Sequence, residues 1–463
     1  MNMDIYDLSL ASFLAIAFMF LAVFKPWLLL RPSFFVGGLM VLFLSLPAVF
    51  VDDVAHASTL TASNYNGYSR IEELRSLTVL FPFFILAWLG LSPGLSLRVR
   101  RLYKESRETW LSGSFNRGDY AGWWVWVAGL ALYLAWYFSV QPLQNTGLWA
   151  TFFNPANYDQ ARQASGSELP SISLKYAQAI MQSAVLPALF ILTWQMKLTG
   201  RRRWIKYIFL LVLLLAASLT GARITAAVII FAAAMVLLLF HGMTKKKRAL
   251  AIVMAAFVCI SAITAISYQR DKERSDIYAI LRAVIGGRLL STPFTTGPMT
   301  LSYVEKIYQG ALNGANIRPW RLLIGSRYVN LPNDAYNYFL PYSPIKTGNL
   351  NTSFVFAYQA GLGLYSGWLL ALLFLCLLDY PILLIISSGP PSPSRIAFQG
   401  ALYVGLVSLV STAFTTALLS GGLLPCLVMY YGLSKLESCG LGHSSRVGTR
   451  QNQAMMLPIP YLR

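Results

Sequence analysis

Long apolar runs alternate with short polar linkers along most of the chain. Many of the runs reach about 20 residues, the length that an α-helix needs to cross a bilayer core of about 30 Å. They consist of consecutive Leu, Ala, Ile and Phe and do not alternate with polar residues as barrel strands do. Because a backbone in lipid must satisfy its own hydrogen bonds, these runs predict membrane-spanning helices. The predicted spans, about eleven in all, are 8–24, 34–51, 77–93, 121–140, 176–196, 207–220, 223–241, 250–268, 364–386, 397–419 and 422–436.

The linkers fall into two alternating sets by their charge. One set is basic and holds Lys25 and Arg31; Arg98, Arg100, Arg101, Lys104, Arg107 and Arg117; Lys197, Arg201, Arg202, Arg203 and Lys206; and Lys245, Lys246, Lys247 and Arg248. The other set comprises the N-terminus, the 52–76 loop and the 141–175 loop. Basic linkers stay in the cytoplasm. We therefore expect the N-terminus on the outer side of the membrane and the C-terminus in the cytoplasm.

One linker is far longer than the others. Residues 269–351 form a polar loop on the predicted outer side of the membrane. Loops of this length are usually functional when they do not form a domain of their own. No internal repeat or separate soluble domain is evident, so we expect residues 1–463 to form a single polytopic membrane domain that includes this loop.

Composition supports a membrane protein and excludes several other classes. Hydrophobic residues make up 56% of the chain and charged residues 12%, too few to coat a soluble protein of 463 residues. The net charge of +19 lies largely at helix ends and does not indicate a nucleic-acid partner. No metal or nucleotide motif occurs, so neither a metal nor a cofactor is expected, and no transport-type charge pair stands out within a span.

Arginines are unusually frequent in the predicted outer loops. Arg223 follows the tight turn Thr220-Gly221-Ala222, at or just inside the outer membrane face. The large loop contributes Arg270, Arg274, Arg282, Arg288, Arg318, Arg321 and Arg327. Guanidinium groups bind phosphate bidentately and stay charged at working pH, which suits a lipid-linked pyrophosphate. For any single arginine, interface snorkelling and pairing with anionic lipid is the better explanation, but a charge at the depth of Arg223 is costly unless it is used.

Aromatic residues and carboxylates add two further hypotheses. The second half of the large loop holds Trp320, Tyr328, Tyr336, Tyr338 and Tyr342, whose rings are suited to pack on sugars or to form an interface belt. A transferase that activates a sugar hydroxyl also needs a general base. The residues leave that choice open among Asp52, Asp53, Glu72, Glu73, Asp159, Glu168, Asp271, Glu273, Asp276, Glu305 and Asp334.

Four segments give the chain a family resemblance. They are NYDQARQASGSELP before the span that starts at 176, LTGARITAAVIIF at the Arg223 turn, GGRLLSTPF in the large loop, and GNLNTSFVFAYQAGLGLYSG at its end. In their order and placement the chain resembles the Wzy-type O-antigen and exopolysaccharide repeat-unit polymerases. These are metal-independent glycosyltransferases at the periplasmic face of the bacterial inner membrane, and they join polyprenyl-pyrophosphate-linked oligosaccharides without a cofactor. The resemblance therefore implies a bacterial inner-membrane protein with a periplasmic N-terminus and a cytoplasmic C-terminus.

The resemblance implies roles for particular residues. Arg223 and Arg288 would hold pyrophosphate, supported by Arg162 and Arg282, and Asn351 and Tyr358 would line the acceptor side. The predicted catalytic residues are thus Arg223, Arg288 and Asp159. The predicted substrate-binding residues are Arg162, Arg282, Arg327, Asn351, Tyr358 and Tyr158. Besides the bilayer and the two glycolipids, the implied partners are a flippase and a chain-length regulator.

Three alternatives stay open at this point. A flippase or other transporter would have short outer loops and repeat symmetry, which this chain lacks. Another lipid-linked glycosyltransferase would place acidic residues after its first span, whereas Asp52 and Asp53 follow the second. The related O-antigen ligases use a histidine near the end of the large loop, where this chain has Asn349 and Asn351, so ligase is less favoured.

Overall fold

Helices and the short segments that connect them make up the described part of the chain. A computed structural model describes residues 5–49, 68–113, 115, 117–154, 157–166, 169–197, 202–220, 223–244, 247, 292–317, 321, 325–341, 352–412, 414–419 and 421–436. No strand occurs within these ranges. The first half contains α1 (Ile5–Phe24), η1 (Pro26–Leu30), α2 (Pro32–Met40), η2 (Val41–Ser45), α5 (Ile71–Leu91), α6 (Pro93–Ser112), α7 (Arg117–Val140), η3 (Leu143–Asn145), α8 (Gly147–Phe153), α9 (Tyr158–Ser165), α10 (Ile172–Ile180), η5 (Met181–Val185), α11 (Leu186–Gln195), α12 (Arg202–Ala217) and α13 (Arg223–Phe240). The second half contains α16 (Thr292–Tyr308), α18 (Leu331–Phe339), α19 (Phe354–Leu362), α20 (Leu364–Ile386), α21 (Pro393–Ser411), α22 (Phe414–Leu419) and α23 (Leu423–Leu436).

Eight helices of the described chain are long and apolar enough to cross a membrane. They are Tyr6–Phe24, Pro32–Val49, Ile71–Leu91, Asp119–Val140, Ile172–Gln195, Leu364–Ile386, Pro393–Val410 and Thr416–Leu433. The all-α membrane architecture is therefore confirmed, whereas the count of eleven is not. The predicted spans 207–220 and 223–241 fall on α12 and α13. Neither is among the eight long helices, although α13 contains the shorter apolar stretch Ala226–Phe240. The predicted span 250–268 lies outside the described residues.

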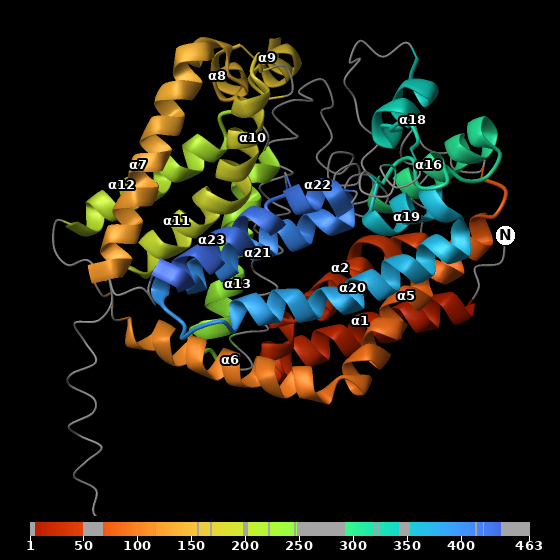
Figure 1. Cartoon of the computed structure of the whole chain (residues 1–463), viewed down its shortest axis with the longest axis horizontal. Helices are drawn as coiled ribbons and strands as arrows, with labels where there is room; N and C mark the ends of the chain where they lie inside the picture. The colour runs from red at the N-terminus through yellow and green to blue at the C-terminus, as the bar shows by residue number, and fades with distance from the viewer. Residues whose placement is uncertain are drawn as a thin grey trace, which may run out of the picture.

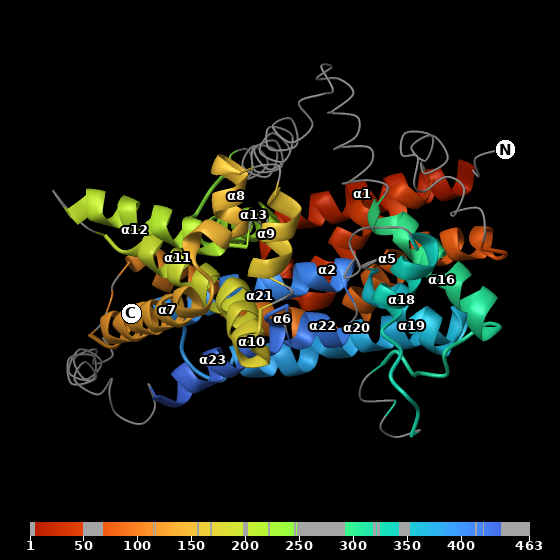
Figure 2. The same cartoon turned by 90° about the horizontal axis from the view of Figure 1, so that it is seen from above.

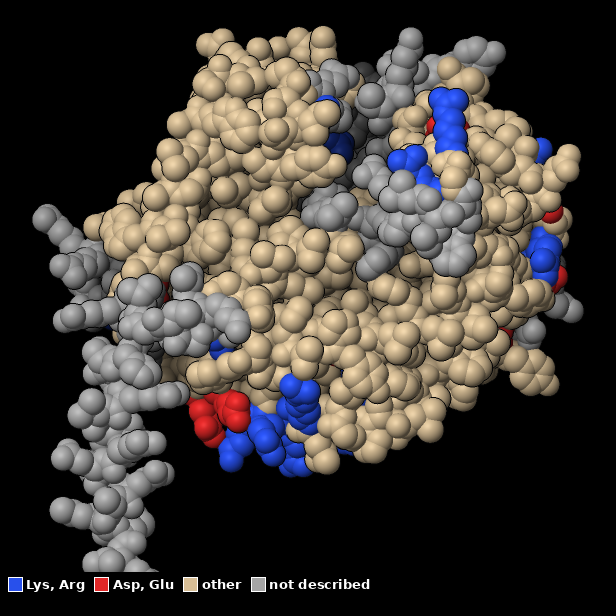
Figure 3. All heavy atoms as spheres, in the orientation of Figure 1, with Lys and Arg blue, Asp and Glu red and all other residues tan. Residues whose placement is uncertain are grey.

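The connecting helices lie on opposite sides of the bundle. Figure 1 shows the amphipathic helix α6 along one side, with α8, α9, α16 and α18 on the other. Seen from above in Figure 2, α16 and α18 lie over the end of α5 and α20, away from α12 and α23. We call these the α6 side and the loop side. Charged residues gather over α6 and beside α16 and α18, and the broad surface between them is largely uncharged (Figure 3).

The centre of the bundle is α21, which packs against α2, α11, α13 and α23. Of its candidate span, 83% is buried. Glycines allow the close approach: a Cβ at Gly400 would lie 2.4 Å from Val236 Cγ2, and one at Gly405 would lie 2.7 Å from the backbone nitrogen of Leu423. Small residues at helix contacts bring backbones close enough for strong van der Waals packing, the main stabilising interaction between helices in lipid.

Large apolar side chains cover the outside of the bundle. Phe13 and Ile16 of α1, and Trp204, Ile205 and Ile208 of α12, are all more than half exposed. In water such a surface would be a strong drive to aggregate. In a bilayer it faces hydrocarbon, so the pattern agrees with the membrane prediction.

A buried ion pair on the α6 side was not predicted, because no charge pair stood out within a span in the sequence. Arg31, which the sequence placed in a cytoplasmic linker, pairs with Asp379 inside α20, 348 residues away. Ser33 donates to both carboxylate oxygens, from its backbone N at 2.8 Å and from its Oγ at 2.6 Å. Trp88 Nε1 donates to the carboxylate at 3.2 Å, and Ser92 Oγ accepts from Arg31 at 2.9 Å. The pairing of Asp379 could not be predicted, because its partner Arg31 lies 348 residues away, just before α2.

Candidate functional site

On the loop side, Ser165 at the end of α9 joins three elements. Its Oγ accepts from the backbone N of Gly147 at 3.2 Å, which ties it to α8. Its carbonyl accepts from Tyr137 Oη of α7 at 3.3 Å and from Gln178 Nε2 of α10 at 3.1 Å. Ser165 is fully buried, so these bonds are shielded from water. The short helices α8 and α9 are thereby fixed on the spans that flank them.

The same unit contacts the turn that precedes Arg223. The backbone N of Leu148 donates to the Leu219 carbonyl at 3.2 Å. A Cβ built on Gly166 would lie 4.0 Å from Thr220 Cγ2 and 3.1 Å from the Arg162 carbonyl, so the end of α9 lies beside Thr220. The 141–175 loop and the Arg223 turn, two of the four segments that carry the resemblance, therefore lie in contact.

The predicted residues of this region are placed as follows. Tyr158 is buried at the first position of α9, and Arg162 is exposed in its last turn. The backbone of Asp159 lies in α9, and that of Arg223 begins α13. Neither side chain of these last two is among the described ones. Arg282, Arg288 and Asn351 lie outside the described residues.

A second group of residues on the loop side is aromatic. Tyr303 of α16 packs edge-on against Tyr308 at 6.0 Å between ring centroids and lies 5.3 Å from Tyr338 of α18. Phe339 extends the group, 5.0 Å from Tyr338. Tyr303 is buried, whereas Tyr308 and Tyr338 are 38% and 42% exposed. Two rings with exposed faces on a buried aromatic base form a surface suited to the apolar faces of sugars. We call this group the tyrosine surface.

Sequence reasoning found Tyr338 but missed Tyr303 and Tyr308. The stretch from 292 to 308 was taken as part of a polar loop, because Pro293, Pro298 and several threonines and serines interrupt its apolar pattern. The structure forms α16 there because the helix packs on α18 and α19. The spacing of Tyr303 and Tyr308 carries no signal until the contact with α18 is known.

Charged residues lie close to the tyrosine surface, because the charge of Asp334 acts on Tyr303 and that of Arg327 acts on Asp334. The Arg321 guanidinium lies 5.4 Å from the ring centroid of Tyr328, a cation–π contact. Arg327 is exposed in the segment before α18. Burial raises the pKa of the Asp334 carboxyl, although its backbone bond with Asn330 and the charge of Arg327 act in the opposite direction. A carboxylate with a raised pKa beside tyrosines has the properties of a general base.

The predicted acceptor-side motif forms a sharp helix reversal. Ser353 caps α19 by accepting from the backbone N of Phe356, and α19 ends at Gly363, where φ is +92°. A Cβ at Gly367 would lie 2.3 Å from the Tyr358 carbonyl, so α20 folds directly back against α19. The glycines of the motif thus have separate reasons: a positive φ at Gly363, close backbone packing at Gly367, and the Asn316 Oδ1 atom 2.6 Å from a Cβ built at Gly361. Tyr358 is buried, its ring stacks on Phe374 at 6.1 Å, and burial raises its pKa to about 12.

Several buried polar atoms near this reversal have no hydrogen-bond partner among the described residues. They are Asn316 Oδ1, Arg321 Nε, Ser326 Oγ, Thr352 Oγ1 and Gln359 Oε1. Asn316 is held in place because its Nδ2 donates to the Ala357 carbonyl at 2.7 Å. Leaving a buried polar atom without a partner costs free energy, so water or a ligand often supplies the missing hydrogen bond. They mark the loop side as a place where a polar ligand gains hydrogen bonds.

Comparisons with known proteins give no further identification. No model of a protein family matches the chain, no curated protein matches it, and no solved structure matches it. Within the described residues, no three His, Cys, Asp or Glu side chains gather as metal ligands. The class of the chain that the structure defines is a polytopic α-helical membrane protein, and its function is argued from the loop side.

Proposed function

We propose that this chain is an inner-membrane glycosyltransferase of the Wzy type. It polymerises polyprenyl-pyrophosphate-linked oligosaccharide repeats into O-antigen or exopolysaccharide at the periplasmic face. The observation that carries the proposal is the tyrosine surface, with Asp334 and Arg327 close to it, on the side of the bundle where α9 contacts the Arg223 turn. Sugar-binding rings, phosphate-binding cations and a base are the groups that the reaction needs.

The reaction balances without any added cofactor. An acceptor hydroxyl oxygen forms a bond to the anomeric carbon of the donor, while the bond from that carbon to pyrophosphate breaks. The hydroxyl proton passes to a carboxylate, for which Asp334 and Asp159 are the candidates. The negative charge that develops on the polyprenyl pyrophosphate is met by guanidinium groups, and this electrostatic contribution dominates when the leaving group is already activated.

The roles follow from the resemblance and from the geometry together. Arg223 and Arg288 bind the pyrophosphate, with Arg162 and Arg282 in support. Tyr308, Tyr338 and Arg327 bind sugar. Asn351 and Tyr358 belong to the acceptor side, where the buried Tyr358 shapes the site from within the core. Tyr158 supports substrate binding as a buried anchor of α9. The partners are the two glycolipids and the bilayer, with a flippase that delivers the repeats and a chain-length regulator.

A transporter of the same glycolipid is the second candidate, since one observation favours it. The fully buried Arg31–Asp379 pair is of a kind that transporters use within their spans. A deletion strain separates the two functions by the size distribution of its surface polysaccharide. Loss of a polymerase leaves single repeats at the cell surface, whereas loss of a flippase removes every periplasmic repeat. A normal ladder in the deletion strain would contradict both.

A further inference from the structure

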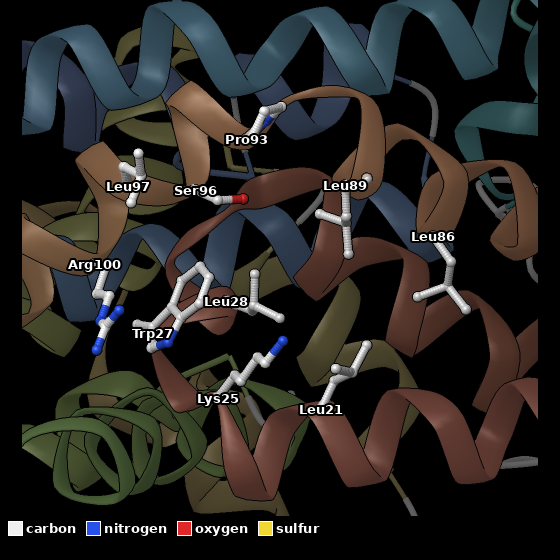
Figure 4. Close-up of a pocket in the computed structure, with 11 residues that line it drawn as sticks. Leu21, Lys25, Trp27, Leu28, Leu86, Leu89, Pro93, Ser96, Leu97 and Arg100 are labelled. Atoms are coloured by element: carbon white, nitrogen blue, oxygen red, sulfur yellow. The ribbon is translucent and has the colours of Figure 1, made fainter.

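A groove on the α6 side has a charged end and an apolar end. It encloses about 500 Å³ between the end of α1, η1, the end of α5 and the start of α6. Figure 4 shows Arg100 and the Trp27 indole at one end and Leu86, Leu89 and Leu21 at the other, with Lys25 between them. Among the described residues that line it, none is acidic.

The two ends of the groove match the two environments of a membrane surface. Lys25 directly follows α1, Arg100 lies in the first half of α6, and both are exposed. Leu21, Leu86 and Leu89 lie within the candidate spans of α1 and α5. Tryptophan is enriched between these zones because its ring is apolar and its N–H is polar.

We propose that this groove binds an anionic glycerophospholipid of the leaflet that α6 faces. The lipid phosphate lies between Lys25 and Arg100, and one acyl chain lies along Leu21, Leu86 and Leu89. Charge complementarity favours this occupant, because two cations with no carboxylate beside them attract a headgroup of net negative charge. The apolar part of the groove favours a lipid over a free anion, since a free anion has no acyl chain to bury there. The volume is in the range of ordinary ligand pockets and fits the phosphate with the upper part of one chain.

Occupancy of the groove is coupled to the packing of the bundle. Ser96 lines the groove, and its Oγ accepts from Arg31 Nη1 at 3.1 Å. Arg31 in turn pairs with Asp379 of α20. A lipid seated in the groove therefore holds α1, α5 and α6 together beside the pair that joins α2 to α20. Binding should raise the thermal unfolding temperature of the protein, because it acts only on the folded state.

The test uses the full-length protein in detergent with three probes: phosphatidylglycerol, phosphatidylcholine and inorganic phosphate. Native mass spectrometry measures bound lipid, and a thermal scan measures stabilisation. Phosphatidylglycerol should bind and stabilise most. Replacing both cations, Lys25→Gln with Arg100→Gln, should weaken its binding about thirtyfold, given the usual contribution of a cation near anionic lipid.

Two further variants separate charge from shape. The pair Arg101→Gln with Lys104→Gln removes equal charge from exposed positions of α6 outside the groove and should leave affinity unchanged. Gly90 lines the groove, and a Cβ there meets nothing within 4 Å, so the side chain of Gly90→Leu has room to fill the groove. This variant leaves the charge unaltered and should abolish lipid retention. Equal stabilisation by phosphatidylcholine or inorganic phosphate, equal loss in the control pair, or undiminished binding to Gly90→Leu would each overturn the proposal.

Discussion

Arg31 Nη2 lies 2.7 Å from Asp379 Oδ2, and both side chains are completely buried. Arg31 caps the start of α2, and Asp379 lies in α20 about two turns from its end. The pair thus joins the first and last parts of the chain, with Ser33 and Trp88 completing the shell of the carboxylate. Its position near the α6 side and its dense hydrogen bonding indicate a structural connection between the helices.

The first prediction concerns the stability of this pair. Removing one partner leaves the other charged and unpaired in a medium of low dielectric constant, so Arg31→Met or Asp379→Leu alone should lower stability by about 3–5 kcal/mol. The double variant removes both charges and should be more stable than the sum of the single effects predicts. Thermal unfolding of the detergent-solubilised variants measures this. Additive losses would show that the two residues act independently.

The second prediction concerns the contact between α16 and α19. A Cβ at Gly297 would lie 2.4 Å from Phe356 Cδ2, and Phe356 is fully buried. Gly297→Ala should therefore destabilise the protein by about 1–3 kcal/mol through overpacking. Adding Phe356→Leu should recover part of that loss by making room.

The matched control for this test lies in α7. A Cβ at Gly129 meets nothing within 4 Å, so Gly129→Ala should be neutral or gain up to about 1 kcal/mol from helix propensity. A similar loss at both glycines would contradict the steric explanation, since only Gly297 faces a ring.

Long apolar runs could be predicted from the sequence, whereas helices held by tertiary contacts could not. The span 364–386 was predicted with both ends correct, because Gly363 stops α19 and the run to Ile386 is strongly apolar in spite of Asp379 and Pro381. In contrast, α5 begins at Ile71 and not at 77, because Arg70 pairs with Glu73 and Arg75 with Glu72 in its first turns. Because these residues are polar, hydropathy alone placed the start of the helix too late in the sequence.

The candidate site shows the same division. The Arg223 turn and α9 were each marked by local motifs, but their contact through Thr220 and Gly166 depends on the fold. The tyrosine surface forms only when α18 meets α16, so no local pattern predicted it. Asp334 was one of eleven candidate carboxylates, and it is its burial beside Arg327 that sets it apart.

The third prediction concerns the proposed pyrophosphate site. Arg223→Ala should lower the rate of polymerisation about 100- to 1,000-fold, as loss of one group that stabilises developing charge usually does. Single repeats should then accumulate on the carrier. Arg223→Lys should restore activity only in part, because lysine lacks the planar fork that binds phosphate bidentately. Lys104→Ala on α6 is the matched loss of charge. Normal chain lengths in inserted Arg223→Ala protein would refute the role, and full rescue by lysine would show that charge alone suffices.

The fourth prediction concerns the base. Burial raises the pKa of Asp334, so the folded state binds its proton more tightly than the unfolded chain does. The free energy of unfolding should therefore fall as pH rises from the ordinary aspartate value of 3.8 through the raised value, and Asp334→Asn should remove this slope. If Asp334 is the base, the same variant should lose roughly 100- to 10,000-fold in turnover. Asp159→Asn is the comparison, and a loss confined to that variant would assign the base to α9.

The fifth prediction concerns the tyrosine surface. Tyr308→Ala or Tyr338→Ala removes an exposed ring and should raise the KM for the acceptor glycolipid roughly 2- to 12-fold, the usual range for one aromatic contact. Replacement by Phe should change KM much less, because the ring that packs on the sugar remains. Tyr207→Ala in α12, also exposed but on the far side from α16, serves as the control. An assay with purified lipid-linked repeats separates KM from kcat. A fall in kcat with unchanged KM would mean that these rings position reacting groups, and equal effects at Tyr207 would mean that they do not bind sugar.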